Sequence, residues 1–336
     1  MIINKRLSTA TVIFVIMFII GYLIILLATL KPIGIDNDSI AYLQNIKDFT
    51  SINNVNLLEK EISFWVILAI NKSYFSNSVE SVMFVYIVLQ IIILWYAIFK
   101  LSDYPLISIL LYINLFFILY GLTQIRVGVA IGIFLIAIPD IYNKNFKSYL
   151  IKVFIAFLFH YSLLFLFLFY FLNPKTLNKT LYYLLPLIGI SFYFLADQYF
   201  DTFTGYILNN TPSFFFRRIQ EVIENARIEN NLTIVNSAVF VKLLFYYFYL
   251  INFKKFTQKY DILYFKLYAI SLLFILFLSF IPILGVRLSQ FTSVVSIIFY
   301  VRYISVFNNK YIPFIIIYLY SVYILYNSFI RYIHIN

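Results

Sequence analysis

The sequence of 336 residues contains no cysteine, only two histidines and few charges. Without cysteine there are no disulfides, and a zinc site of the usual Cys/His type cannot be assembled. Its 8 glycines are scattered, and no G-x-x-x-x-G-K-[ST] phosphate loop occurs. We therefore expect neither ATP hydrolysis within this chain nor a zinc site of that type.

Charged residues make up 12% of the chain and hydrophobic residues 63%. A soluble globular domain carries about 25% charged residues, so the composition predicts an integral membrane protein. Backbone at membrane depth must form its hydrogen bonds internally, and the apolar runs are continuous rather than alternating, which favours helices. At about 20 residues per span, there is room for roughly nine to eleven helices, some of them short or re-entrant. The predicted fold is all-α and polytopic, a single membrane domain over residues 1–336.

The net charge of +11 comes from basic residues between the hydrophobic runs. Such residues mark cytoplasmic loops, so no nucleic-acid partner is expected. Lys5 and Arg6 place the N-terminus in the cytoplasm, and the run from Thr11 to Leu30 resembles a signal anchor. Residues 31–60 and 201–235 are then external loops. Further spans are expected at about 82–99, 104–120, 122–141, 181–200, 236–253, 262–281, 288–304 and 312–330.

Two segments depart from simple spans. Residues 62–75 are apolar but are interrupted by Asn71 and Lys72, which predicts an interfacial or re-entrant helix. Lysines flank the run 153–172 on both sides. Either this run is a hairpin of two short helices with His160 near its tip, or it is one tilted span that breaks the charge rule.

Arg126 is the most costly residue of the membrane region. A guanidinium stays charged at any accessible pH, and this one lies in an otherwise uncharged run from Pro105 to Pro139. The predicted topology gathers other polar side chains on the same external side: Asp36, Asp38, Glu61, His160, Arg217, Arg218 and Arg287. Guanidinium groups suit phosphate, and a carboxylate or a neutral imidazole accepts a proton from a hydroxyl. The set predicts a site for an anionic lipid with a polar head.

Most of these residues also have an ordinary structural explanation, whereas Arg126 and Arg287 do not, because arginines that reach out of the membrane usually do so on the cytoplasmic side. Asp36 and Asp38 fit a helix cap, and Glu61 fits a charge at a helix N-terminus. His160 lies among phenylalanines and fits a core histidine, while Arg217 and Arg218 fit interfacial charges.

Short motifs in a fixed order resemble the EpsG/Wzy-type polysaccharide polymerases of bacterial envelopes. A D-x-x-x-Y segment at Asp38 and Tyr42 follows the first helix, and Glu61 precedes the aromatic pair 64–65. An R-x-x-x-A span entrance begins at Arg126, a Phe-His motif ends at His160, and a late arginine is Arg287. Family members often have a small residue after the histidine, whereas this chain has a tyrosine, so that motif matches less closely.

The resemblance implies a GT-C-like membrane fold and a glycosyltransferase reaction that requires no metal or cofactor, although Asp36 and Asp38 could hold a metal. Repeat units carried on undecaprenyl pyrophosphate would be polymerised at the outer face of the bacterial cytoplasmic membrane, to make O-antigen, capsule or exopolysaccharide. Arg126 and Arg287 would serve the pyrophosphate, and Asp38, Glu61 and His160 compete for the role of base. The residues expected to bind substrate are Asp36, Tyr42, Gln124, Arg217 and Arg218. A chain-length regulator and a flippase are implied partners.

Most of the rival functions also use a polyprenyl-linked sugar. A flippase for lipid-linked oligosaccharide would also need arginines, but along a path through the bilayer. A glycosyltransferase that uses a polyprenyl-phosphate sugar, or an O-antigen ligase, would work on the same side of the membrane. A membrane acyltransferase would rest on His160 alone and would leave the external arginines unexplained.

Overall fold

The computed structural model describes residues 2–52, 55, 60–75, 77–210, 237–278 and 282–334. Every long regular element in these residues is a helix, which confirms the all-α polytopic prediction. The chain forms two compact units: unit 1 comprises residues 1–173 and 300–336, and unit 2 comprises residues 174–299. Each unit is described by itself. The prediction of one membrane domain concerns how the units associate, and it stays a prediction.

Unit 1 contains most of the long helices. Its elements are α1 (Ile2–Thr29), α2 (Asn37–Asp48), α3 (Ile62–Tyr74), α4 (Val79–Leu101), α5 (Pro105–Phe116), the π-helix η2 (Phe117–Thr123), α6 (Ile125–Asn143), α7 (Phe146–Phe159), the 3-10 helix η3 (Tyr161–Phe171) and α14 (Tyr311–His334). Unit 2 contains α8 (Lys179–Asn210), α10 (Ser237–Ile251), the 3-10 turn η4 (Phe253–Lys255), α11 (Asp261–Phe277) and α12 (Pro282–Ser293). The helix α13 (Ser296–Val306) passes from unit 2 into unit 1.

Five helices in the described residues are long and apolar enough to cross a membrane: Thr9–Thr29, Val79–Leu101, Pro105–Thr123, Ile125–Asn143 and Tyr311–Ile330. A sixth span arises if α12 and α13, which meet at a bend of 50°, are counted together. Three shorter apolar helices add to these. The prediction of roughly nine to eleven helices included short or re-entrant segments, and several apolar runs do form short or bent helices.

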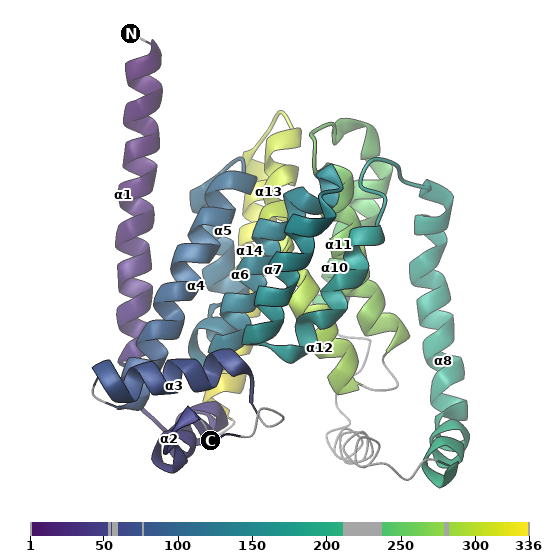
Figure 1. Cartoon of the computed structure of the whole chain (residues 1–336). Coiled ribbons are helices and arrows are strands. Elements are labelled where there is room, and N and C mark those ends of the chain that lie inside the picture. Colours follow the sequence, from purple (N-terminus) through teal and green to yellow (C-terminus); the bar gives the residue numbers. More distant parts are fainter. Residues whose placement is uncertain are drawn as a thin grey trace. The chain divides into compact units, whose positions relative to one another are not determined.

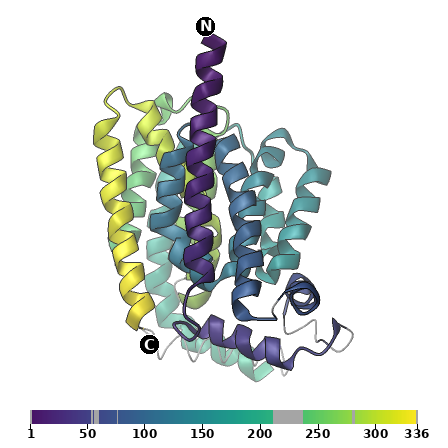
Figure 2. The same ribbon diagram turned by 90° about the vertical axis from the view of Figure 1, so that its left-hand side faces the viewer.

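Close packing of α6 against α4 fixes the middle of unit 1. A side chain at Gly128 would meet Gln90 at 2.4 Å, and one at Gly132 would meet Ile93 at 3.0 Å. Small residues four positions apart let two membrane helices approach closely. On the outer side of α4, the Trp95 indole donates to the Met17 carbonyl of α1 at 2.8 Å, so α1 lies along α4 (Figure 2). These contacts leave α6 little freedom to shift, and α6 carries Arg126.

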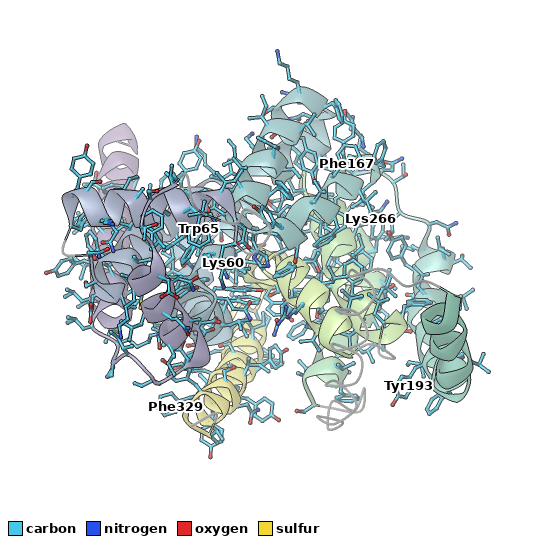
Figure 3. The ribbon with its side chains drawn as sticks, turned by 60° about the horizontal axis from the view of Figure 1, so that its bottom comes forward. Lys60, Trp65, Phe167, Tyr193, Lys266 and Phe329 are labelled. Atoms are coloured by element: carbon cyan, nitrogen blue, oxygen red, sulfur yellow. The ribbon has the colours of Figure 1, made fainter. Side chains whose placement is uncertain are left out.

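The two short helices α2 and α3 lie across one end of unit 1, where α1 ends (Figure 1). They run across the helix ends rather than beside the long spans, as predicted for residues 62–75. Figure 3 looks toward this end, with Lys60 and Trp65 labelled. Trp65 stacks on Phe49 at the C-terminal end of α2, with ring centroids 6.1 Å apart. The two helices therefore form one aromatic layer over this end of the bundle.

The run 153–172 is the hairpin, not the single span. Beyond the tip at His160, η3 returns along α7, and the Tyr149 hydroxyl donates to the Leu166 carbonyl. At the open end, the Lys144 ammonium donates to the Tyr170 carbonyl at 2.8 Å and to the Leu172 carbonyl at 2.7 Å. Lys144 and both arms' ends thus lie at one end of unit 1, and His160 lies at the other.

Unit 2 is held by stacked and hydrogen-bonded aromatic residues. Tyr249 of α10 stacks on Phe265 of α11 with centroids 4.2 Å apart, and the Tyr246 hydroxyl donates to the Tyr182 carbonyl of α8 at 2.6 Å. Residues 201–210, expected in an external loop, continue α8 instead. The remainder of that predicted loop, residues 211–235, lies outside the described residues.

Candidate active site

The candidate site centres on the carboxylate of Glu61, at the end of unit 1 that α2 and α3 cover. Glu61 is buried and immediately precedes α3, as its N-cap residue, without capping the helix through its side chain. One carboxylate oxygen lies 2.9 Å from Nδ1 of His160, and the other accepts a hydrogen bond from the Arg126 guanidinium. A single side chain therefore connects α3, the entrance of α6 and the tip of the α7–η3 hairpin.

Arg126 owes its position to a break in the helix. The π-helix η2 ends at Thr123, Gln124 leaves helical geometry with φ −82° and ψ 58°, and α6 begins one residue later. Pi-helical turns at such breaks occur frequently at functional sites. The guanidinium also lies over the ring of Phe64, 5.4 Å from its centroid, and hydrogen-bonds the Tyr42 hydroxyl. It is thus oriented from three sides by α2 and α3.

Glu61 is held in its ionised form. Burial by itself raises the pKa of this carboxyl, but the hydrogen bond with His160 and the charge of Arg126 together bring the pKa below its ordinary value. An ionised carboxylate only accepts hydrogen bonds. The His160 ring must therefore donate through Nδ1, which leaves Nε2 as the acceptor of a neutral imidazole.

Asp38 and Tyr42 lie four residues apart on α2, so they share one face of the helix. Burial raises the pKa of the Asp38 carboxyl, against the opposing effect of the Arg126 charge. Burial also raises the pKa of the Tyr42 hydroxyl, which therefore stays protonated. Both side chains lie close enough to Arg126 for their ionisation to be affected by it, which places the D-x-x-x-Y segment at the site.

Asp36 and Gln124 lie beside this cluster. Asp36 caps α2 by accepting from the Ser39 backbone N–H at 2.8 Å, and it forms an ion pair with Lys31 at 2.5 Å. Gln124 contributes its backbone carbonyl to the Gly128 N–H at the start of α6. The structure thus gives both residues structural partners, and their binding of substrate stays a prediction.

The other predicted arginines lie elsewhere in the chain. Arg287 is exposed on α12 in unit 2. Arg217 and Arg218 lie outside the described residues. Their roles toward the pyrophosphate stay predictions.

The sequence alone did not point to the roles of Phe64 and Lys31. Phe64 belongs to the aromatic pair after Glu61, but nothing in its spacing shows that an arginine stacks on it. Lys31 ends the first apolar run on the side predicted to be external, where the charge rule does not favour a lysine. That exception was a usable signal. Among the described residues, no group of three or more His, Asp or Glu side chains is arranged to hold a metal ion.

The sequence model of the EpsG family matches residues 14–335. The chain belongs to the EpsG family. This is the family of Wzy-type polysaccharide polymerases, so this EpsG-family chain is a multi-pass membrane protein of polysaccharide biosynthesis. No curated protein and no solved structure matches it.

Proposed function

We propose that this protein polymerises oligosaccharide repeat units that are linked to undecaprenyl pyrophosphate, at the external face of the cytoplasmic membrane. A hydroxyl of one lipid-linked unit attacks the anomeric carbon of the glycan carried by another. The observation that carries the proposal is the double engagement of Glu61, with His160 on one oxygen and Arg126 on the other. One carboxylate thereby holds both a candidate base, the His160 imidazole, and a cation, the Arg126 guanidinium. Transfer of the glycan needs a base for the attacking hydroxyl and a cation for the leaving pyrophosphate.

His160 is the base in this proposal. Its Nδ1–H is held by the ionised Glu61, so the Nε2 lone pair faces away from that contact and accepts the proton of the attacking hydroxyl. Glu61 then stabilises the imidazolium that forms. Glu61 itself is a poor base, because both of its oxygens are engaged and its pKa is lowered by His160 and Arg126 despite burial.

Arg126 binds the leaving group. A guanidinium has five N–H donors, and contacts with Glu61 and Tyr42 leave others for pyrophosphate oxygens. As the hydroxyl oxygen bonds to the anomeric carbon, the bond from that carbon to the pyrophosphate oxygen breaks. The electron pair leaves with polyprenyl pyrophosphate, whose growing charge Arg126 stabilises. Arg287, Arg217 and Arg218 are further candidates for this anion.

The distribution of charge in unit 1 supports an external site. Arg126 begins α6, and Lys144 follows the other end of this 19-residue helix, about 28 Å away at 1.5 Å per residue. Lys100 and Lys147 lie at the same end as Lys144, whereas at the site end the cations Lys31 and Arg126 are paired with the carboxylates of Asp36 and Glu61. Positive residues favour the cytoplasmic side.

The absence of cysteine makes this orientation testable with single-cysteine variants. Gln44 is exposed on α2 at the site end, and Lys147 is exposed on α7 at the other end. A membrane-impermeant maleimide should label Gln44→Cys in intact cells and should label Lys147→Cys only after the membrane is opened. The reverse pattern would overturn the external placement.

Deletion of the gene, followed by sizing of the surface polysaccharide, tests the function itself. A polymerase predicts loss of long chains while single repeat units still reach the surface. A flippase predicts that unpolymerised units stay inside the cell, and a ligase predicts long chains that remain on the lipid carrier. Unchanged chain lengths would refute the proposal.

A further inference from the structure

Lys31 lies just beyond the C-terminal end of α1 and is buried, with its side chain only 4% exposed. Its ammonium donates to Asp36 Oδ2 at 2.5 Å and to the Leu122 carbonyl oxygen. A lysine at the end of an apolar helix would ordinarily reach toward water or lipid head groups. Here it turns inward, and its partners are 5 and 91 positions away in the sequence.

The contact with Leu122 occupies a carbonyl at the helix break. In an uninterrupted α-helix, the Leu122 carbonyl would accept the backbone N–H of Arg126, four residues later. The π-helix η2 and the departure at Gln124 interrupt that pattern, and the Gln124 N–H bonds instead to Leu119. Lys31 therefore contacts the segment that determines where α6 starts and how Arg126 leaves it.

The contact with Asp36 reaches the start of α2. Asp36 accepts from the Ser39 N–H at 2.8 Å, and the Ser39 hydroxyl donates back to the Asp36 carbonyl at 2.8 Å. Asp38 and Tyr42 follow on this helix, and the Tyr42 hydroxyl meets the Arg126 guanidinium. Capping α2 requires only the Asp36 carboxylate, so the cap does not account for a buried lysine that also contacts Leu122.

We propose that Lys31 is a positioning residue that sets Tyr42 and Asp38 on α2 against Arg126 on α6. It contacts neither the attacking hydroxyl nor the leaving group. Its ammonium hydrogen-bonds both to Asp36 at the start of α2 and to Leu122 in the turn before α6. This inference rests on the proposed function, because it concerns the orientation of the guanidinium that binds the leaving group. Loss of these two hydrogen bonds changes the orientation of the Arg126 guanidinium toward the leaving group.

The test is chain extension by the purified full-length protein in vesicles, with lipid-linked repeat units extracted from cells that lack the gene. Lys31→Met should lower kcat by about 10- to 100-fold, the effect of a small misplacement of a catalytic group. KM should change by less than about threefold, because the glycan and the polyprenyl chain supply most ground-state binding. A wild-type kcat for Lys31→Met would overturn the inference.

Lys31→Met also leaves Asp36 as a buried charge without its partner, which lowers Tm for a purely structural reason. The double variant Lys31→Met/Asp36→Asn removes both charges and should recover most of the Tm. If Lys31 positions the site, kcat of the double variant stays low although stability returns, and it stays below that of Asp36→Asn alone, which keeps the contact of Lys31 with Leu122. Recovery of kcat together with Tm would show a structural role only and would overturn the inference.

Lys72 offers a matched control at the same end of unit 1. It also bonds to a backbone carbonyl at the end of α2, that of Thr50 at 2.8 Å, but it does not reach the break before α6. Lys72→Met should keep kcat within about twofold of wild type, as expected for an exposed polar contact. An equal loss of kcat in Lys72→Met would refute a specific role for Lys31.

The same assay separates the two proposals. If the wild-type protein does not extend chains, the proposed function fails and the role of Lys31 fails with it. If the wild type extends chains and the double variant does so at the same rate, only the role of Lys31 is overturned.

Discussion

Among the described residues of unit 1, two arginine–carboxylate pairs differ in which partner is the more shielded. In the pair Glu61–Arg126, the acid is the more shielded partner, with side chains 7% and 18% exposed respectively. In the pair Asp103–Arg302, the arginine is the shielded partner, 4% exposed against 26% for the acid, and it also donates to the Ser305 hydroxyl at 2.5 Å. The same two chemical groups thus present opposite charges outward.

This difference indicates what each pair does. Arg302 of α13 has its donors turned to Asp103 and Ser305, so the pair fastens the α4–α5 connection to the C-terminal part of the chain. Arg126 contacts Glu61 and Phe64, and its side chain keeps 18% of its surface exposed, against 4% for Arg302. A buried ion pair by itself is weak evidence for either stability or function. The direction in which the cation is open makes Arg126, rather than Arg302, suited to an anionic substrate.

Replacement of each arginine by lysine should give the largest contrast. Arg126→Lys keeps the charge but loses the planar fork and the stacking on Phe64, so chain extension should fall by about 10²- to 10³-fold. Arg302→Lys should leave kcat within about threefold, because only its fastening role is weakened. The measurement is the rate of chain extension in vesicles, normalised to folded protein. Equal losses in both variants would remove the functional distinction between the pairs.

Neutral isosteres of the two acids should give the next largest contrast. In Glu61→Gln, the amide can turn its NH₂ toward His160 Nδ1, which would place the proton on Nε2 and block the proposed base. We expect kcat to fall by about 10²-fold, within the range for loss of general-base catalysis. Asp103→Asn leaves Arg302 with Ser305 and should lower Tm more than kcat. Full activity in Glu61→Gln at normal protein level would exclude His160 as a base that depends on Glu61.

Arg287 tests whether an open guanidinium in unit 2 serves the same anion. Arg287→Ala removes an exposed side chain, so the protein level should stay normal. If it binds pyrophosphate, the surface polysaccharide should lose its long chains, with a rate loss of about 10-fold or more. The control is Arg302→Lys, examined on the same gels. Wild-type chain lengths in Arg287→Ala would refute its assigned role.

The smallest effect is expected at Asp38, through stability. Burial raises the pKa of this carboxyl, so the folded state holds its proton to higher pH than the unfolded state does. The free energy of unfolding therefore falls as pH rises from the pKa of Asp38 in the unfolded chain to its pKa in the folded protein. At neutral pH, the buried ionised carboxylate lowers stability. Asp38→Asn should raise Tm at pH 7 by about 1–3 °C. The gain should vanish toward pH 3.8, the ordinary value of the group, and thermal melts at both pH values check it.

Composition and charge spacing predicted the class of fold and the end of the molecule that carries the site. The low charge content predicted membrane helices, and Asn71 and Lys72 separated α3 from the spans. The lysines around 153–172 made the hairpin one of two options. Glu61, Arg126 and His160 were all candidates, because each is costly in an apolar chain.

Pairings between distant residues could not be read from the sequence. Glu61 meets partners 65 and 99 positions away, and no local periodicity encodes such a contact. Apolar content also does not show where a helix bends, as between α12 and α13. The role of Lys31 required knowing that η2 exposes a carbonyl, a property of the backbone rather than of the residue type.

The α7–η3 hairpin has two arms of different helical type and nearly equal length. The 14 residues of α7 rise about 21 Å at 1.5 Å per residue, and the 11 residues of η3 rise about 22 Å at 2.0 Å per residue. The stretched return arm therefore crosses the same depth with fewer residues and brings the chain back level with Lys144. An α-helical return arm of 11 residues would span only about 16 Å. Because η3 is a 3-10 helix, its 11 residues are long enough to match α7. His160 therefore lies level with Glu61, while the two outer ends of the hairpin lie together at the opposite end of unit 1.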